Sequence, residues 1–290
     1  RQTGLKVFPS LKLQDSAKLQ SERCGLLKQA RGAEVCIGDE GRAEWCYDFA
    51  HEAVHEDKLA MVGEVLDDYC ADGLELDFCF DNFYFKSADV EKNVPLMNDF
   101  MAKVRRLASD IGQRQGREIP LMARVHLKEA DNLAVGLDVP AWIEAGSIDW
   151  VVGQDANILV DPGIQTPWLA QAATAAGGVA YYRPPRRIYD ERVELPSIEM
   201  YRALSQTLAW QGYSGLYLGY MPWPFSEREY QILREAAFPE VHVRRDKRYL
   251  LQPREGAPGA PTTTPERELP EPLVEGETVA FDVWVADDVD

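Results

Sequence analysis

The fold is decided by residues 72–81, which read Asp-Gly-Leu-Glu-Leu-Asp-Phe-Cys-Phe-Asp. Acidic and apolar residues alternate here with the period of a β-strand, in which successive side chains point to opposite faces of the sheet. We expect the apolar residues to pack outward against helices, which points Glu75 and Asp77 inward. Buried carboxylates are costly unless they are paired or used. Two interpretations stay open: an ion-paired network with Arg124 of the next strand, or a catalytic Asp77 supported by a deeper Glu75.

Short apolar runs like this one recur along the chain and alternate with amphipathic helical patterns. The expected strands are Leu5–Leu11, Gly73–Phe78, Ile119–Val125, Asp149–Gly153, Val179–Tyr182 and Gly215–Tyr220. The expected helices are Glu52–Tyr69, Val94–Gly112, Val139–Ala145, Ile198–Gln211 and Ser226–Ala237. The last helix begins with Ser226 and carries Glu229 three residues later, which is a capping-box pattern.

Strands that alternate with helices predict right-handed crossovers and a parallel sheet, and therefore an α/β fold. We expect a (β/α)8 TIM-type barrel, an architecture for which about 250 residues is typical. Six clear units fall short of eight, so we expect the first one or two to lie upstream or to be missing. The competing open, doubly wound sheet lacks support, because no glycine-rich phosphate loop follows any expected strand.

The end of the chain differs in composition from the rest. Prolines, glycines and a threonine run between residues 253 and 272 predict an exposed linker without regular structure. The barrel domain is therefore expected to span residues 1–252. Alternating apolar residues in Thr278–Val285 predict a β segment. Residues 273–290 are expected to form the first strand of a β-sandwich-like domain, or to pair back on the barrel.

Charge and hydropathy exclude several classes of partner. The 290 residues contain 48 acidic and 31 basic side chains, which gives a formal net charge of −17 and a pI near 4.7. This sign opposes binding to a phosphate backbone. No apolar run approaches the roughly 18 residues of a membrane helix. We therefore expect neither nucleic acid as a partner nor membrane insertion, and the sequence leaves the oligomeric state open.

In a parallel α/β fold the chemistry collects at the carboxyl ends of the strands. The polar and aromatic residues expected at these ends are Lys12, Asp15, Glu75, Asp77, Arg124, His126, Asp155, Tyr182, Arg183, Tyr220 and Trp223. Sugars present hydroxyls to polar groups and apolar C–H faces to aromatic rings. A mouth lined by such residues therefore suits a carbohydrate substrate.

Several motifs carry a family resemblance: Tyr47-Asp48-Phe49-Ala50-His51 before a helix, the strand at 72–78, Gly136-Leu137-Asp138-Val139, and Asp246-Lys247-Arg248-Tyr249. Across residues 4–252 the chain resembles glycoside-hydrolase-like (β/α)8 barrel proteins, in particular the family-10-like group of hypothetical glycosyl hydrolases. The resemblance implies that residues 72–78 form the fourth strand of a barrel that binds carbohydrate, and it favours an exported protein. We expect no cofactor.

The resemblance also implies a pair of catalytic acids. Xylanase-like barrels carry glutamates after strands four and seven, whereas Val179–Arg183 ends without one. Chitinase-like barrels close their acidic motif with a glutamate, where this chain has Cys79. The remaining acids are similar to those of α-galactosidase-type barrels. In that arrangement Asp77 would attack the anomeric carbon, and Asp155 would protonate the leaving oxygen and then activate water.

Two other functions stay open. His51-Glu52-Ala53-Val54-His55 fits the H-E-x-x-H pattern, which on a helix places two imidazoles and a glutamate for a zinc-dependent hydrolase. The residues that follow lack the glycine and histidine of a metzincin, so we expect no metal. The other alternative is a non-catalytic carbohydrate-binding barrel, because a fold does not by itself establish an activity.

Overall fold

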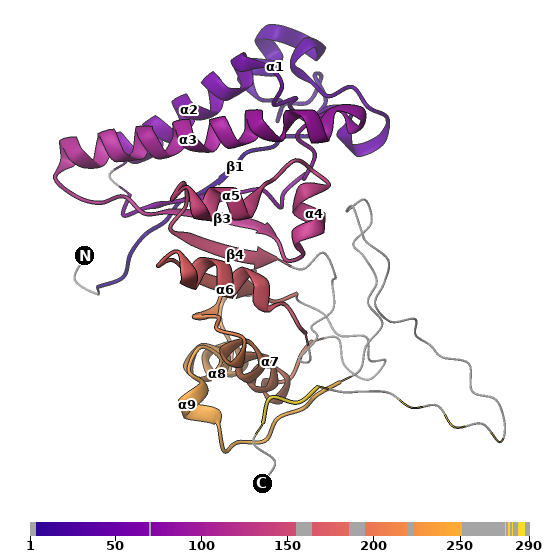
Figure 1. Ribbon diagram of the computed structural model, residues 1–290, viewed down its shortest axis with the longest axis vertical. Helices are drawn as coiled ribbons and strands as arrows, with labels where there is room; N and C mark the ends of the chain where they lie inside the picture. The colour runs from indigo at the N-terminus through magenta and orange to yellow at the C-terminus, as the bar shows by residue number, and fades with distance from the viewer. Residues whose placement is uncertain are drawn as a thin grey trace. The chain divides into compact units, whose positions relative to one another are not determined.

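The computed structural model describes residues 4–69, 71–154, 164–185, 195–219 and 223–250, together with 276, 278, 280 and 284–287 near the C-terminus (Figure 1). The chain forms two compact units. The first unit comprises residues 1–152 and 175–178, and the second comprises residues 153–174 and 179–290. Each unit is described separately below.

The first unit is built on parallel strands that follow one another in chain order. These strands are β1 (Ser10–Lys12), β2 (Leu74–Asp77), β3 (Leu121–His126) and β4 (Trp150–Gln154), of which β4 continues beyond the unit boundary. The pairings of β1 with β2 and of β2 with β3 are parallel. The backbone N–H of Asp149 donates to the carbonyl of Leu121 at 2.9 Å, which ties the start of β4 to β3.

The register of these strands sorts their side chains into rows. Lys12, Asp77 and Arg124 are partners in one row. Ser10 and Glu75 lie two residues earlier along their strands and therefore project to the same face. The residues between these along each strand, such as Leu76, project to the opposite face, where the helices pack. Leu76 is fully buried. The alternation in residues 72–78 thus has the physical basis expected from the sequence.

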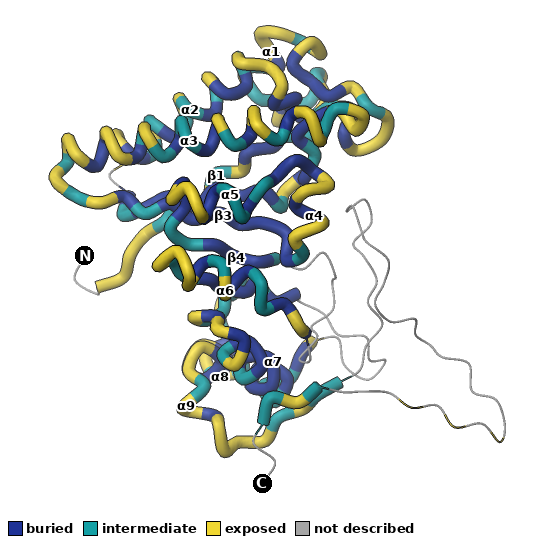
Figure 2. Tube along the Cα trace, in the orientation of Figure 1, coloured by how far each residue is buried: buried dark blue, intermediate teal, exposed yellow. Residues whose placement is uncertain are grey.

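Helices cover the apolar face of the first unit. They are α1 (Leu26–Arg31), α2 (Glu52–Asp67), α3 (Val90–Gln115), α4 (Glu129–Leu133) and α5 (Val139–Glu144), with 3₁₀ turns at Gly32–Val35, Gly41–Ala43 and Ser87–Asp89. Helices α2 and α3 run side by side (Figure 1). Their inner sides are buried and their outer sides exposed (Figure 2). On α3, buried residues recur at helical spacing, from Met97 through Phe100, Met101 and Val104 to Ala108.

The second unit contains the remaining elements. They are α6 (Pro167–Ala175), β5 (Val179–Arg183), α7 (Ile198–Trp210), β6 (Gly215–Leu216), α8 (Glu227–Glu235) and α9 (Pro239–His242). Strands β5 and β6 are parallel, with Tyr181 opposite Gly215. Helix α8 carries the predicted capping box: the Ser226 side chain accepts from the N–H of Glu229, and the Ser226 N–H donates to Glu229 Oε2 at 2.9 Å.

The predicted α/β class is confirmed. A strand is present at or near each of the six expected places, but β1 begins at Ser10 instead of Leu5 and β6 ends at Leu216 instead of Tyr220. Helices separate the strands along the chain as in a (β/α)8 barrel, two strands short of eight among the described residues. The expected linker at 253–272 lies outside the described residues, as does most of the C-terminal segment 273–290, so both remain predictions. None of the described helices is long and apolar enough to cross a membrane.

Candidate functional site

The centre of the candidate site is a buried cluster of two carboxylates and one guanidinium in the first unit. Glu75 and Asp77 on β2 are each 2% exposed. On β3, Arg124 donates from Nε to Glu75 Oε1 at 3.0 Å and from Nη2 to Asp77 Oδ2 at 2.5 Å. The Ser10 hydroxyl donates to Glu75 Oε1 at 2.8 Å. The ion-paired network considered from the sequence is therefore present, and it places Asp77 above Glu75 toward the carboxyl end of the strand.

An aromatic pair underlies this cluster at the other end of the strands. Phe8, which precedes β1, stacks on Trp150 of β4 with ring centroids 4.8 Å apart. Gly73 makes room for this ring: a Cβ there would lie 2.3 Å from Phe8 Cε1 and 2.7 Å from the Pro120 carbonyl oxygen. The stacked rings form an apolar layer below the row of Ser10 and Glu75 and the row of Lys12, Asp77 and Arg124.

Burial and charge act on Asp77 in opposite directions. Loss of hydration raises the pKa of the Asp77 carboxyl above its usual value, whereas the charge of Arg124 and the N–H of Cys79, 2.9 Å from Oδ1, lower it; burial is the larger effect. Arg124 thus favours the ionised form of Asp77 and partly offsets the effect of burial on its pKa. An ionised, dehydrated carboxylate at a strand end can act as a nucleophile or stabilise a developing positive charge.

Beside Asp77, the exposed residues Lys12 at the end of β1 and Phe80 after β2 form a rim together with the buried Asp81 and Asn82. Lys12, the row partner of Asp77, places its ammonium 3.5 Å from the centroid of the Phe80 ring. Phe80 is 40% exposed. Asp81 follows with a left-handed backbone, φ +47°, and its carboxylate accepts from the Ser16 hydroxyl at 2.6 Å and from Arg42 Nη2 at 3.0 Å.

His126 ends β3 two residues after Arg124 and is 5% exposed. Asn82 Nδ2 lies 3.1 Å from His126 Nε2, and the His126 backbone exchanges two hydrogen bonds with the Asn132 side chain. Burial lowers the pKa of the imidazole to about 4. The ring is therefore neutral near pH 7, which lets Nε2 accept from the Asn82 amide.

Asp15 lies in the segment after β1, and its carboxylate is held by two hydrogen bonds and an ion pair. Its carboxylate accepts from the N–H groups of Ala17 at 2.8 Å and Gly25 at 3.0 Å, and the Lys28 ammonium lies 3.0 Å from Oδ2. Burial acts to raise the pKa of Asp15, but these bonds outweigh it and lower the pKa. The same ammonium, 0% exposed, donates to the carbonyls of Asp15, Ala17 and Trp45 at 2.7, 2.9 and 3.0 Å.

A second buried lysine belongs to this region. Lys58 on α2 is 4% exposed, lies 3.1 Å from Asp57 Oδ2, and places its ammonium 4.3 Å from the centroid of Tyr47. The Lys28 ammonium is 4.9 Å from the same centroid. Burial lowers the pKa of Lys58. Tyr47 thus lies near two enclosed cations, and its backbone exchanges two hydrogen bonds with the Gln14 side chain, which tie the start of the Tyr47–His51 motif to the segment after β1.

Three predicted site residues of the second unit lie among the described residues, namely Tyr182, Arg183 and Trp223. Tyr182 is fully buried and packs edge-on against Tyr213 with centroids 6.3 Å apart. Arg183 ends β5 and is partly exposed. Trp223 is 80% exposed and contacts Phe225 edge-on at 5.2 Å. Asp155 and Tyr220 lie outside the described residues.

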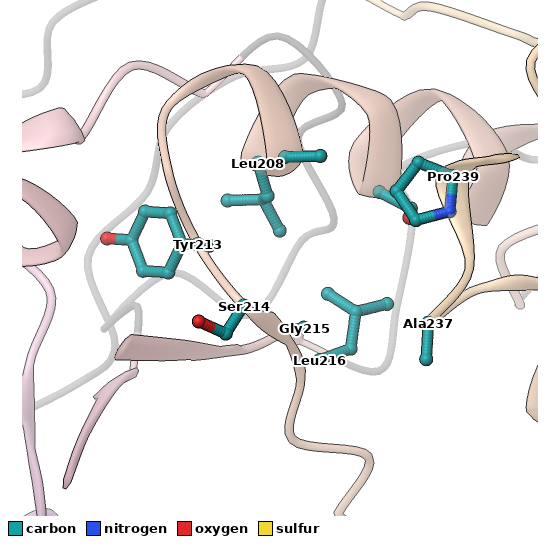
Figure 3. A pocket seen from close by; sticks show the side chains of 9 residues that line it. Leu208, Tyr213, Ser214, Gly215, Leu216, Ala237 and Pro239 are labelled. Carbon is teal, nitrogen blue, oxygen red and sulfur yellow. The ribbon is translucent and has the colours of Figure 1, made fainter. Parts of the chain in front are cut away.

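A small cavity of about 50 Å³ lies in the second unit between α7, the start of β6 and the α8–α9 connection. It is lined mainly by apolar residues, among them Leu208, Leu216, Ala237 and Pro239 (Figure 3). Ser205 also lines it, and the Ser205 hydroxyl lies 3.2 Å from His242 Nε2.

The H-E-x-x-H segment has a structural explanation in this fold. His51 is the residue before α2, with an extended backbone, and its side chain is 45% exposed. His55 is buried, and its Nε2 lies 2.8 Å from the carbonyl of Phe49. The ring also packs against Phe100 with centroids 5.1 Å apart. Within the described part of the chain, no group of three histidine, cysteine or acidic side chains is arranged to hold a metal.

The rim residues Phe80, Asp81 and Asn82 were not predicted from the sequence. Phe80 continues the alternation of the strand and lies directly after the acidic pair, so its position beside a strand end was the one signal that could have found it. The backbone of Asp81 and the long-range partners of both polar residues depend on loops that sequence spacing does not bring together.

Comparisons with known proteins found matches among solved structures only. No protein-family model matches the chain, and no curated protein matches it. Three similar solved structures are an α-galactosidase from Thermus thermophilus (17% identity, TM-score 0.46, 82% of this chain and 48% of that one), the glycoside hydrolase domain of a PelA variant from Pseudomonas aeruginosa (17%, 0.49, 75% and 80%) and that of PgaB from Bordetella bronchiseptica (13%, 0.45, 74% and 70%).

This chain thus spans about half the length of the α-galactosidase.

Proposed function

We propose that this chain is a glycoside hydrolase domain that acts on an oligo- or polysaccharide, with Asp77 as a catalytic carboxylate. The observation that carries the proposal is the position of Asp77: buried, held beside Arg124, and at the carboxyl end of β2. Chemistry in parallel α/β folds is located at this end. A purely structural ion pair gains little from such burial, because desolvation offsets the attraction between the charges.

The proposed mechanism uses two carboxylates. Asp77 forms a bond to the anomeric carbon while the glycosidic C–O bond breaks and Asp155 gives its proton to the leaving oxygen. Asp155 then takes a proton from the water that releases the sugar from Asp77. By sequence, Asp155 is the residue directly after β4. A separation of about 5–5.5 Å between the two carboxyls would mean retention, and about 6.5–9.5 Å would mean inversion with Asp77 as base.

The other predicted residues would act around this pair. Glu75 lies deeper and shares Arg124 with Asp77, so its proposed role is to hold the guanidinium in place. Arg124, His126, Lys12 and Asp15 of the first unit are proposed to position the sugar directly or through the loops they fix. In the second unit, Arg183, Tyr220 and Trp223 are proposed as sugar contacts, whereas Tyr182 is fully buried against Tyr213 and can act only through its packing.

The test is Asp77→Asn on a panel of p-nitrophenyl α- and β-glycosides and soluble polysaccharides, with released reducing ends as the readout. The amide keeps the shape and the burial, so the expected result is a folded protein whose turnover falls at least about 10³-fold. Asp149→Asn is the matched control. It weakens another Arg–Asp pair, Arg105–Asp149 at 2.5 Å, at the opposite end of the sheet, and should leave turnover unchanged.

A nucleophile can be distinguished from a residue that only positions the sugar. Asp77→Gly removes the carboxylate, and azide added to this variant should restore turnover and yield a glycosyl azide if Asp77 attacks the anomeric carbon. Turnover that persists in Asp77→Asn would remove Asp77 from the mechanism.

One observation favours the second candidate, a non-catalytic carbohydrate-binding domain. Both oxygens of Asp77 already accept hydrogen bonds, from Cys79 and Arg124, and the side chain is 2% exposed. Such a carboxylate could fix the shape of a binding surface without reacting. Glycan binding by the wild-type chain without turnover of any member of the panel would favour this function over hydrolysis.

A further inference from the structure

The rim beside Asp77 contains an aromatic ring that the proposed mechanism does not use. Phe80 is 40% exposed although it lies three residues after the fully enclosed part of β2. The Lys12 ammonium covers part of the ring at 3.5 Å from the centroid, a cation–π contact. Lys12 and Asp77 are row partners in the sheet. The ring, the ammonium and the buried carboxylate therefore lie at one edge of the first unit.

The backbone that carries Phe80 is held in an uncommon conformation. Asp81 has φ +47°, a conformation that non-glycine residues seldom adopt and that persists only where the surroundings impose it. The hydrogen bonds from Ser16 and Arg42 to opposite oxygens of the Asp81 carboxylate supply that constraint. Asn82 is fixed in turn by His126. Phe80 is thus the exposed member of a loop whose next two residues are tied down.

We infer that Phe80 and Lys12 form a platform that binds a pyranose residue of the substrate next to the bond that Asp77 cleaves. This inference rests on the proposed function. The Lys12 ammonium lies over one face of the Phe80 ring and holds it by a cation–π contact. The apolar C–H face of a sugar can therefore stack on the opposite face of the ring. A protein partner fits less well, because a stable interface needs about 800 Å² on each side, far more than one aromatic ring offers.

The experiment compares Phe80→Ala, Phe80→Tyr and a matched control, Leu96→Ala. Leu96 on α3 is 39% exposed, so its truncation removes a similarly exposed apolar side chain from a helix. With the best substrate of the panel, Phe80→Ala should raise KM about tenfold with kcat changed less than about twofold. Phe80→Tyr keeps the ring and should retain a KM near that of the wild type, and Leu96→Ala should change neither constant.

Binding is measured separately from turnover, by electrophoresis through gels that contain soluble galactomannan, xylan or polygalacturonate. The Asp77→Asn protein should be retarded by at least one of these glycans, and Asp77→Asn/Phe80→Ala should migrate as in a gel without glycan. Equal retardation of the two proteins, or an unchanged KM in Phe80→Ala, would overturn the platform. Either result would leave the role of Asp77 in hydrolysis intact.

The role of the Asp81 turn has its own readout. Asp81→Ala loses both clamping bonds, whereas Asp81→Asn keeps an acceptor and a residue type that tolerates positive φ. Asp81→Ala should raise KM as Phe80→Ala does, and Asp81→Asn should do so much less. Because both changes act through one ring, the double variant Phe80→Ala/Asp81→Ala should be no worse in KM than Phe80→Ala. Independent, multiplying effects would show that the turn does not act through Phe80.

Discussion

Arg124 and Asp77 are row partners on neighbouring parallel strands, and their side chains meet at 2.5 Å in a place with almost no access to water. The same guanidinium reaches Glu75 through a different nitrogen. Two carboxylates therefore share one cation. The cluster faces the side of the sheet away from the helices, where the proposed reaction takes place.

Removal of the shared cation, Arg124, should destabilise the folded protein strongly. Arg124→Met keeps an unbranched side chain but leaves two buried carboxylates without it, and we expect a loss of about 3–5 kcal/mol in the free energy of unfolding at pH 7. Urea denaturation followed by far-ultraviolet circular dichroism measures this loss. The triple variant Arg124→Met/Glu75→Gln/Asp77→Asn removes the stranded charges and should recover part of it. A single variant within about 1 kcal/mol of the wild type would show that Arg124 does not hold the two carboxylates in this way.

Two glycine-to-alanine changes should have opposite signs. At Gly73 a Cβ would meet both the Phe8 ring and the Pro120 carbonyl oxygen at under 3 Å, so Gly73→Ala should destabilise the protein by roughly 1–3 kcal/mol. At Gly63, inside α2, the nearest heavy atom to a Cβ is Leu107 Cδ2 at 3.9 Å. Gly63→Ala should therefore stabilise by about 0.5–1 kcal/mol, through helix propensity. Thermal and urea unfolding of both variants measure the two changes in stability and show whether their signs are opposite.

The buried imidazole of His126 should make stability depend on pH. Its pKa is lowered from 6.5 to about 4 in the folded chain, so between these values the unfolded chain binds the extra proton. This contribution to stability is complete above pH 6.5 and is lost as the pH falls toward 4. The loss approaches roughly 3 kcal/mol, at about 1.4 kcal/mol for each pKa unit.

His126→Gln isolates this term, because the variant lacks the titrating ring and retains all other ionisable groups. Urea unfolding at pH 7 and at pH 4.5 gives the stability difference between wild type and variant at each pH. The advantage of the wild type should shrink by about 2–3 kcal/mol at the lower pH. A difference that stays constant between the two pH values would show that His126 does not titrate as described.

The capping box of α8 offers a test confined to the second unit. Ser226→Ala removes the acceptor for the Glu229 N–H at the start of the helix, and should cost about 1 kcal/mol. Ser226→Thr keeps a hydroxyl and should cost much less. Hydrogen exchange of the first-turn amides of α8 measures the local effect, and equal protection in the two variants would contradict it.

The sequence predicted β2 and β3 well because the fold buries every residue of these strands. It placed β1 and β6 less well, since Ser10–Lys12 is mostly exposed and Gly215–Leu216 is only partly buried. It predicted the long helices α2 and α3 because a stripe of apolar residues at helical spacing is typical of a helix packed on a core. Helices α1, α4, α6 and α9 were missed. With nine residues or fewer, each has too few turns for a periodic stripe to be visible, and tertiary contacts determine them.

The acidic cluster was predictable and the rim was not. Residues two apart on a strand share a face, which brings Glu75 and Asp77 together, and the adjacent strand supplies Arg124 by the parallel register. The bonds from Ser16 and Arg42 to Asp81 join residues 65 and 39 positions apart, and no local rule pairs them. In the H-E-x-x-H segment, His51 precedes α2, which begins at Glu52 as expected, so the helix does not align His51 with His55.

The enclosure of Lys28 has a consequence for chemical labelling. Its amine is fully covered and held by three carbonyls and the Asp15 carboxylate, so an acylating reagent can reach it only when the loop after β1 opens. The rate at which Lys28 acquires a label therefore reports the opening of that loop. Exposed lysines on the same chain react without this delay, and their labelling rate serves as the internal reference.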